Sequence, residues 1–178
     1  MSKYIKTALF VAIFTLVLGW VISIQFESKE NTYTGLPHKN KPAPGFTLKD
    51  ESGKTVSLNQ FKGKLIYLKF WTSWCGDCIK QVVPQRKIED QLAKDDRIVF
   101  INISVDDDLQ AWHKSVKRNK LIGYELISRD GDEDSIDDNY GISEIPRYIL
   151  IGKDGNVLDN NAPKPSEIDV DYFYNFLK

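Results

Sequence analysis

Hydrophobic side chains form one long uninterrupted segment near the N-terminus of this 178-residue chain, followed by shorter, regularly spaced runs. The long segment, residues 7–24, contains no charged side chain. As a helix it would span about 27 Å, close to the thickness of the hydrocarbon core of a bilayer. Because Lys3 and Lys6 precede it, the positive-inside rule places the N-terminus in the cytoplasm and the rest of the chain outside.

This segment predicts three parts: a signal anchor or transmembrane helix at 1–26, a polar, proline-bearing linker at 27–44, and one globular domain at 45–178. A cleaved secretory signal is the alternative interpretation. Its apolar region is normally shorter and ends in small residues at the cleavage site. Residues 21–24, Val-Ile-Ser-Ile, do not supply them. We therefore expect an anchor that is not cleaved.

After the linker, apolar runs alternate with amphipathic stretches. Residues 65–71 are nearly all apolar, as expected of a central strand covered on both faces. Two shorter runs flank a turn at 50–53 and predict an N-terminal β-hairpin. Ser166 is expected to cap a final helix whose aromatic stripe packs on the sheet. Strands are expected at 46–48, 55–58, 65–71, 97–105, 124–127, 147–151 and 157–158, and helices at 79–93, 109–118, 135–139 and 167–177. The sum is an α/β domain, a mixed central sheet with helices on both faces.

Composition narrows the functional classes. The 24 basic and 25 acidic residues are interspersed and give a net charge of −1, so no nucleic-acid surface is expected. Two acidic runs, 106–108 and 130–138, resemble calcium sites only superficially. The second lacks the central glycine and terminal glutamate of an EF-hand loop. We interpret both runs as solvated loops and expect no metal.

The only two cysteines, Cys75 and Cys78, lie between a predicted strand and a predicted helix. This places Cys75 at a helix N-terminus, where unpaired backbone N–H groups and the helix dipole stabilise a thiolate. Cys78 would lie one turn further in and less exposed. Such a pair supports dithiol/disulfide exchange. A zinc site would need two more ligands, and His38 and His113 are not spaced as a second half-site.

Three segments carry a family resemblance: Pro-Gly-Phe-Thr-Leu from Pro44, Lys-Phe-Trp-Thr-Ser-Trp-Cys-Gly-Asp-Cys from Lys69, and Tyr-Gly-Ile-Ser-Glu-Ile-Pro-Arg from Tyr140. From about residue 42 to the C-terminus the chain resembles the TlpA/ResA-like thioredoxin family. Members are membrane-tethered, extracytoplasmic thiol–disulfide oxidoreductases. The resemblance implies a thioredoxin-like fold, a bacterial inner-membrane location with a periplasmic domain, and no cofactor.

The resemblance also implies roles for individual residues. Cys75 matches the nucleophile and Cys78 the resolving cysteine. Trp74 matches the aromatic residue beside the nucleophile. Pro146 matches a cis-proline that faces the pair and leaves the backbone of Ile145 free to pair with an extended substrate. The expected partners are protein or small thiol/disulfide substrates and a membrane or extracytoplasmic electron donor. The fold does not fix the direction of electron flow, because it serves reductants and oxidants alike; we expect a reductase.

The chain departs from the family pattern at several positions. Asp77 replaces a common proline, and its charge opposes thiolate formation. Gln81 stands where a glutamate is frequent, and Pro84 comes one residue later than usual. Lys69 lies in the apolar strand where relatives often carry a carboxylate or amide. If buried, its ammonium group needs a partner, with Asp77 or a cysteine thiolate nearest in sequence; the alternative is that it extends to solvent.

Two other functions remain open at this point. A thiol peroxidase on the same fold would need a proline, a threonine and the reactive cysteine in Pro-x-x-x-Thr-x-x-Cys order. Thr72 fits that pattern, but Leu68 occupies the proline position. A redox-inactive or metal-handling module would need a histidine or methionine beside the thiolates, and the single methionine is Met1.

Overall fold

The computed structural model describes residues 37–129 and 136–178. The predicted anchor, residues 1–26, lies outside these ranges, as do residues 27–36 of the linker and part of the second acidic run. Within the described ranges, no helix combines the length and apolar character needed to cross a bilayer. Asn40 and Ala43, assigned to the linker, donate backbone hydrogen bonds to Val157 and Gly155, so this end of the linker lies against the domain.

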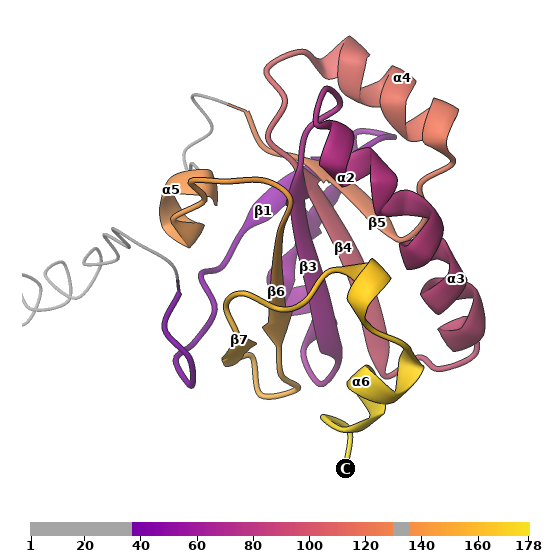
Figure 1. The fold of residues 1–178 in the computed structure, drawn as a ribbon. Helices are drawn as coiled ribbons and strands as arrows, with labels where there is room; N and C mark the ends of the chain where they lie inside the picture. Colours follow the sequence, from indigo (N-terminus) through magenta and orange to yellow (C-terminus); the bar gives the residue numbers. More distant parts are fainter. Residues whose placement is uncertain (1–36, 130–135) are drawn as a thin grey trace, which may run out of the picture. The chain divides into compact units, whose positions relative to one another are not determined.

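The described residues form a seven-stranded mixed sheet in the order β2-β1-β5-β4-β3-β6-β7 (Figure 1). The central strand β3 pairs with β4 in parallel and with β6 antiparallel. The predicted hairpin is present, and β1 also pairs with β5, so the hairpin extends the main sheet. The strands are β1 (Thr47–Asp50), β2 (Thr55–Ser57), β3 (Leu65–Trp71), β4 (Ile98–Ser104), β5 (Tyr124–Ile127), β6 (Arg147–Ile151) and β7 (Val157–Asp159).

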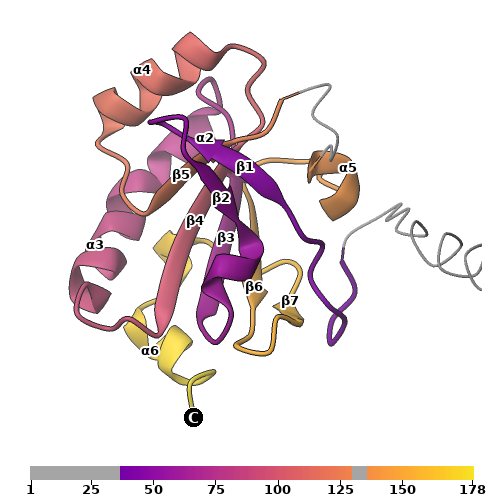
Figure 2. The ribbon, with the colours of Figure 1, turned by 180° about the vertical axis from the view of Figure 1, so that it is seen from behind.

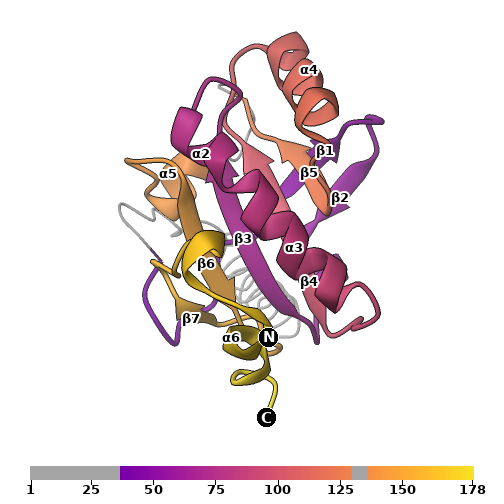
Figure 3. The same cartoon turned by 45° about the vertical axis from the view of Figure 1, so that its right-hand side comes forward.

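Helices cover both faces of this sheet, as predicted. Figure 3 shows α3 lying along one face, with α4 and α6 on the same side. Figure 2 shows the molecule from the side of the β1–β2 hairpin. The helices are α2 (Gly76–Lys80), α3 (Val82–Leu92), α4 (Leu109–Asn119), α5 (Ile136–Tyr140) and α6 (Val170–Tyr174), with 3₁₀ turns η1 (Leu58–Phe61) and η2 (Pro165–Glu167).

Alternate side chains of β3 enter different cores because successive residues of a strand point to opposite faces. Leu65 and Tyr67 pack with α3 and with Phe173 of α6. Ile66, Leu68 and Phe70 pack on the opposite face, where α5 contributes Ile136 and Tyr140. All seven residues of β3 are buried, which explains why its sequence is almost continuously apolar.

The prediction of one continuous helix after the cysteines is wrong. The helix is interrupted at Gln81, which ends α2 and precedes α3. Pro84 has no N–H to donate to the carbonyl of Lys80, so a single helix would lose a hydrogen bond there. Starting a new helix at Val82 puts Pro84 in a first turn, where that N–H is not needed.

The prediction of a final helix at 167–177 capped by Ser166 is also wrong. Ile168 is extended and packs against the core, which separates η2 from α6. The cap of α6 is Asp169, whose carboxylate accepts from the Asp171 N–H at 3.0 Å. Of the predicted aromatic stripe, Phe173 is fully buried and Phe176 is 38% exposed.

We expect Asp108→Ala to lower the free energy of unfolding by about 1 kcal/mol, because its carboxylate caps α4 by accepting from the N–H groups of Gln110 and Ala111. Urea denaturation measures this loss. The matched control is Asp107→Ala, at the exposed neighbouring position, where a change below about 0.5 kcal/mol is expected. Equal losses in the two variants would contradict the capping role.

Candidate active site

The two cysteines are joined by a disulfide at the start of α2, with a Cα–Cα distance of 5.2 Å. Cys75 is the N-cap residue of α2, and its Sγ accepts from the Cys78 N–H at 3.1 Å. Cys78 is fully buried, whereas Cys75 retains 7% of its surface. The structure therefore shows the predicted placement of Cys75 at a helix N-terminus, with Cys78 further inside.

The surroundings of the disulfide combine a buried core with one exposed aromatic side chain. The fully buried Trp71 and Trp112 pack in one cluster with both cysteines, and Ile145, in the segment just before β6, packs against it. The Ile145–Pro146 peptide bond is cis, as the resemblance implied. Trp74 is 75% exposed, so it offers an apolar surface directly before Cys75.

Asp106, in the first acidic run, is buried, so the prediction that this run is a solvated loop is wrong at that position. Its carboxylate accepts from the Ser73 N–H and hydroxyl, both at 2.7 Å, and from the Ser104 hydroxyl at 2.6 Å. Because β3 and β4 are parallel, their C-terminal ends meet at one edge of the sheet. Asp106 thereby ties the turn before Cys75 to the end of β4, a role that no pattern in the sequence indicates.

Arg147 is a second buried charged residue that the sequence analysis did not select. Its guanidinium group pairs with Glu144 and donates to the Asn161 Oδ1 at 2.5 Å. Glu144 and Arg147 flank the Ile145–Pro146 bond. Their ion pair therefore stabilises the conformation of the loop that packs against the disulfide cluster. The signal in the sequence was an arginine at the start of an otherwise apolar strand.

The charge of Asp77 is offset by Lys80 and not by Lys69. The Lys80 Nζ lies 2.8 Å from the Asp77 Oδ1, and both side chains are 76% exposed. The hydrogen bond and the charge of Lys80 lower the pKa of Asp77. Asp77 is therefore an exposed carboxylate between the cysteines, paired with Lys80.

Lys69 is 1% exposed, so the alternative that it extends to solvent is wrong. Its Nζ lies 5.4 Å from the centre of the Trp71 ring. The charges that act on it are those of Glu125 on β5 and Glu89 on α3, not the predicted Asp77. Burial lowers the pKa of Lys69, and the two carboxylates oppose that effect.

Gln85 and Asn102 link these carboxylates. The Gln85 Nε2 donates to the Glu89 Oε1 at 2.9 Å and to the Asn102 Oδ1 at 3.0 Å. The Asn102 Nδ2 donates to the Glu125 Oε1 at 2.6 Å. Burial raises the pKa of Glu89 to about 7 and also raises that of Glu125. The sequence showed Lys69 as unusual but gave no sign of these partners.

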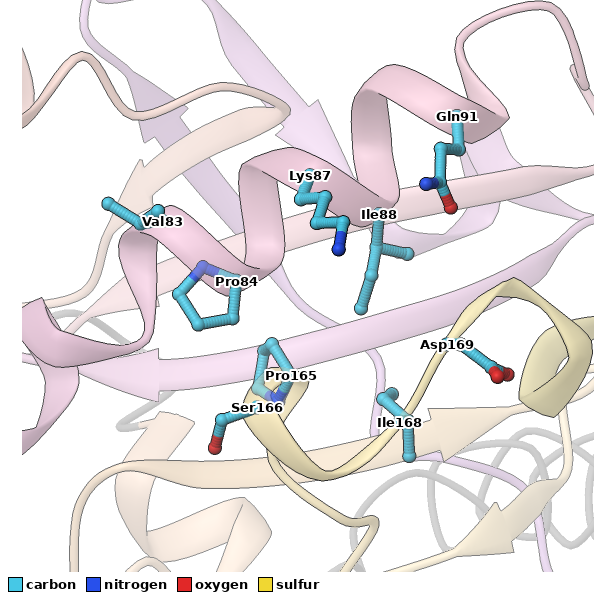
Figure 4. Close-up of a pocket in the computed structure, with 9 residues that line it drawn as sticks. All are labelled: Val83, Pro84, Lys87, Ile88, Gln91, Pro165, Ser166, Ile168 and Asp169. Atoms are coloured by element: carbon cyan, nitrogen blue, oxygen red, sulfur yellow. The ribbon is translucent and has the colours of Figure 1, made fainter.

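A groove of about 410 Å³ lies between α3 and the η2–α6 segment (Figure 4). Val83, Pro84 and Ile88 line it on α3, and Pro165 and Ile168 line the facing side. None of its lining residues belongs to the sulfur site. We therefore treat the groove as separate from the candidate active site.

We expect the stability of the protein to fall as pH rises from about 4.5 to about 7, because folded Glu89 retains a proton that the unfolded chain loses. Between pH 5 and pH 8 the free energy of unfolding should therefore decrease by about 2 kcal/mol less in Glu89→Gln than in the wild type. Urea unfolding at the two pH values measures it, with Asp96→Asn at an exposed position as control. An unchanged pH dependence in Glu89→Gln would show that Glu89 is ionised throughout.

Comparison with known proteins agrees with this geometry. Residues 38–177 match the Redoxin family. The chain is 31% identical over 145 residues to the thiol-disulfide oxidoreductase ResA of Bacillus cereus, an alignment that covers 82% of this chain and 76% of the relative. It is 26% identical over 176 residues to ResA of Bacillus subtilis, covering 98% and 93%.

Among solved structures, the thioredoxin domain of a thiol-disulfide oxidoreductase from Bacteroides vulgatus has a TM-score of 0.71 and 24% identity. The match covers 79% of this chain and 99% of that domain, and it shows the shared fold. Since the family match spans most of the chain and includes both cysteines, the chain belongs to the Redoxin family and, within it, to the ResA/TlpA-like thiol–disulfide oxidoreductases.

Proposed function

We propose that this thiol–disulfide oxidoreductase is tethered to the membrane, faces the extracytoplasmic space and reduces disulfides in protein substrates. The observation that carries the exchange chemistry is the Cys75–Cys78 disulfide at the start of α2, with Cys75 nearer the surface. The Cys78 N–H, which points at the Cys75 Sγ, would stabilise a thiolate on Cys75. Cys75 is therefore the proposed nucleophile.

In the proposed cycle, the Cys75 thiolate of the reduced protein attacks a substrate disulfide. A mixed disulfide forms, and one substrate sulfur leaves as a thiolate. Cys78, as a thiolate, then attacks the Cys75 sulfur, which closes the Cys75–Cys78 disulfide and releases the second substrate thiolate. Two electrons pass to the substrate, whose two sulfurs take up two protons. An external dithiol donor returns the protein to its reduced form.

The surface beside Cys75 supports a protein substrate. Trp74 offers an exposed apolar face next to the reacting sulfur. Ile145 packs against the disulfide cluster at the head of β6, where its backbone would pair with an extended substrate segment. Pro146 has no N–H to donate, so the proposed backbone hydrogen bonds to the substrate come from Ile145 and not from Pro146. Buried Cys78 would then react with Cys75 and not with the substrate.

The charges around the two cysteines support the proposed role as a reductant. A strongly oxidising protein of this fold has a stabilised reduced form. Cations near the sulfurs give that stabilisation, because they favour the thiolate. Here Lys80 is paired with Asp77, and Lys69 faces two carboxylates. These charges give the thiolate little extra stabilisation, which favours a reductant.

The membrane location rests on the sequence. Residues 7–24 carry no charge, and the nearest preceding charges are positive. This arrangement supports a single-pass anchor in a bacterial inner membrane, with the N-terminus cytoplasmic and the catalytic domain periplasmic.

We expect Cys78→Ser to accumulate a mixed disulfide with insulin through Cys75, since the residue that releases the substrate is missing. Cys75→Ser should lower insulin reduction to the uncatalysed rate. Non-reducing electrophoresis and turbidity measure the two outcomes. A stable adduct through Cys78 in Cys75→Ser would reverse the assignment of the nucleophile, and peroxide consumption in place of insulin reduction would favour a thiol peroxidase.

We expect alkaline phosphatase fused after Lys178 to be active in cells and to remain in the membrane fraction. Replacing both Lys3 and Lys6 with glutamate should reduce that activity, because the charge difference across the apolar segment is lost. Lys39→Glu, beyond the apolar segment, is the matched control. Release of the whole fusion as a soluble protein would contradict the anchor.

A further inference from the structure

A row of polar side chains crosses the sheet beneath the disulfide, on the face covered by α3. The strand register pairs Lys69 of β3 with Asn102 of β4, and Asn102 with Glu125 of β5. On the other side, Tyr148 of β6 pairs with Lys69. All four side chains are more than nine-tenths buried. The strands thus hold these four polar side chains in one layer, which α3 covers through the contact of Gln85 with Asn102.

This layer contains more acid than base. Lys69 is its one lysine, while Glu125 and, from α3, Glu89 supply two carboxyl groups. Among the described residues, the Lys69 Nζ and the second oxygens of Glu89 and Glu125 have no hydrogen-bond partner. When all three groups are ionised the net charge is −1, and one added proton makes it zero. A low-dielectric interior favours the neutral form.

The remaining groups around the layer do not alter this balance. Tyr148 is neutral, because burial raises its pKa further above its ordinary value. Arg86 and Asp90 of α3 act on Glu89 with opposite signs, and Glu51 acts weakly on Glu125.

The polar layer lies directly below the disulfide. Lys69 and Trp71 are two positions apart along β3, a rise of about 7 Å. The Lys69 Nζ faces the Trp71 ring, and Trp71 packs in the same cluster as both sulfurs. On the helix side, Cys78, Val82, Gln85 and Glu89 follow one another at spacings of three or four residues, and all four are buried. A row of buried side chains on α2 and α3 therefore runs from the resolving cysteine to a carboxyl group of the layer.

We propose that Lys69, Glu89 and Glu125 together bind one exchangeable proton, and that this proton sets how readily the Cys75–Cys78 pair forms a thiolate. Without the proton, the net negative charge below the sulfurs disfavours a thiolate. With the proton bound, that repulsion is absent. Because linkage is reciprocal, a thiolate also makes the layer hold its proton more tightly. The three residues are positioning residues, since they act on the sulfurs through their charge.

The first experiment measures the rate of iodoacetamide alkylation against pH in the full-length reduced protein. Glu125→Gln leaves Lys69 and Glu89 as a balanced pair, so it should lower the midpoint of the alkylation profile by about one pH unit relative to wild type. Glu89→Gln should act in the same direction, which guards against a folding defect in either variant. Asp96→Asn, at an exposed position, should leave the midpoint unchanged.

The second experiment follows the titration of the glutamate carboxyl carbons by ¹³C NMR in the oxidised and reduced protein. A buried glutamate should titrate near neutral pH, and its midpoint should rise on reduction once a thiolate is present. Lys69→Met should raise that midpoint further, because the carboxylates lose their cation; Lys94→Met, at an exposed position, should not.

Alkylation midpoints that coincide in wild type and both glutamine variants would overturn the proposal. So would carboxyl titrations that do not respond to the redox state. The proposal rests on the proposed function only in taking Cys75 as the reactive thiol. If the wild type fails to reduce insulin while the glutamine variants still shift the alkylation midpoint as predicted, the proposed function is refuted and the proton-binding layer is not.

Discussion

The pairing of β3 between β4 and β6 positions every part of the candidate site. Because β3 and β4 are parallel, the turn before Cys75 meets the segment after β4, where Asp106 holds Ser73. Because β3 and β6 are antiparallel, the start of β6 reaches the same edge and brings Ile145 against the disulfide. Three separate stretches of the chain meet there because hydrogen bonding fixes their register. A slip of one residue would exchange the side chains that face α3 with those that face α5, so the two cores could no longer pack.

The same register places charge inside the domain. Moving an ammonium or carboxylate group from water into a protein interior costs several kcal/mol, so isolated buried charges are rare. Lys69, Glu89 and Glu125 are tolerated because they face one another and because Gln85 and Asn102 donate to the carboxylates. Well-packed apolar residues in the same space would give an equal or higher free energy of unfolding. Retention of the charged groups is therefore consistent with a functional layer.

The interruption at Gln81 separates the short helix that carries the cysteines from the longer helix that packs on the sheet. The Gln81 side chain accepts from the Ser166 N–H at 3.0 Å, so the break is also a contact with the C-terminal segment. α3 can thus follow the direction set by its buried residues, while α2 presents the sulfur pair. A single straight helix would have one axis for both tasks. Two connected helices can differ in direction, so one packs on the sheet while the other presents the sulfur pair.

The sequence by itself determined the α/β class, the central apolar strand, the hairpin and the start of the helix after Cys75. These features follow from local patterns: hydrophobic periodicity, turn residues and the spacing of the cysteines. The family resemblance added the cis bond before Pro146. Only the tertiary structure decided the partners of Lys69, the burial of Asp106 and the division of the last helix at Ile168. Each of these depends on strand register or on packing between segments far apart in the chain, which no local pattern records.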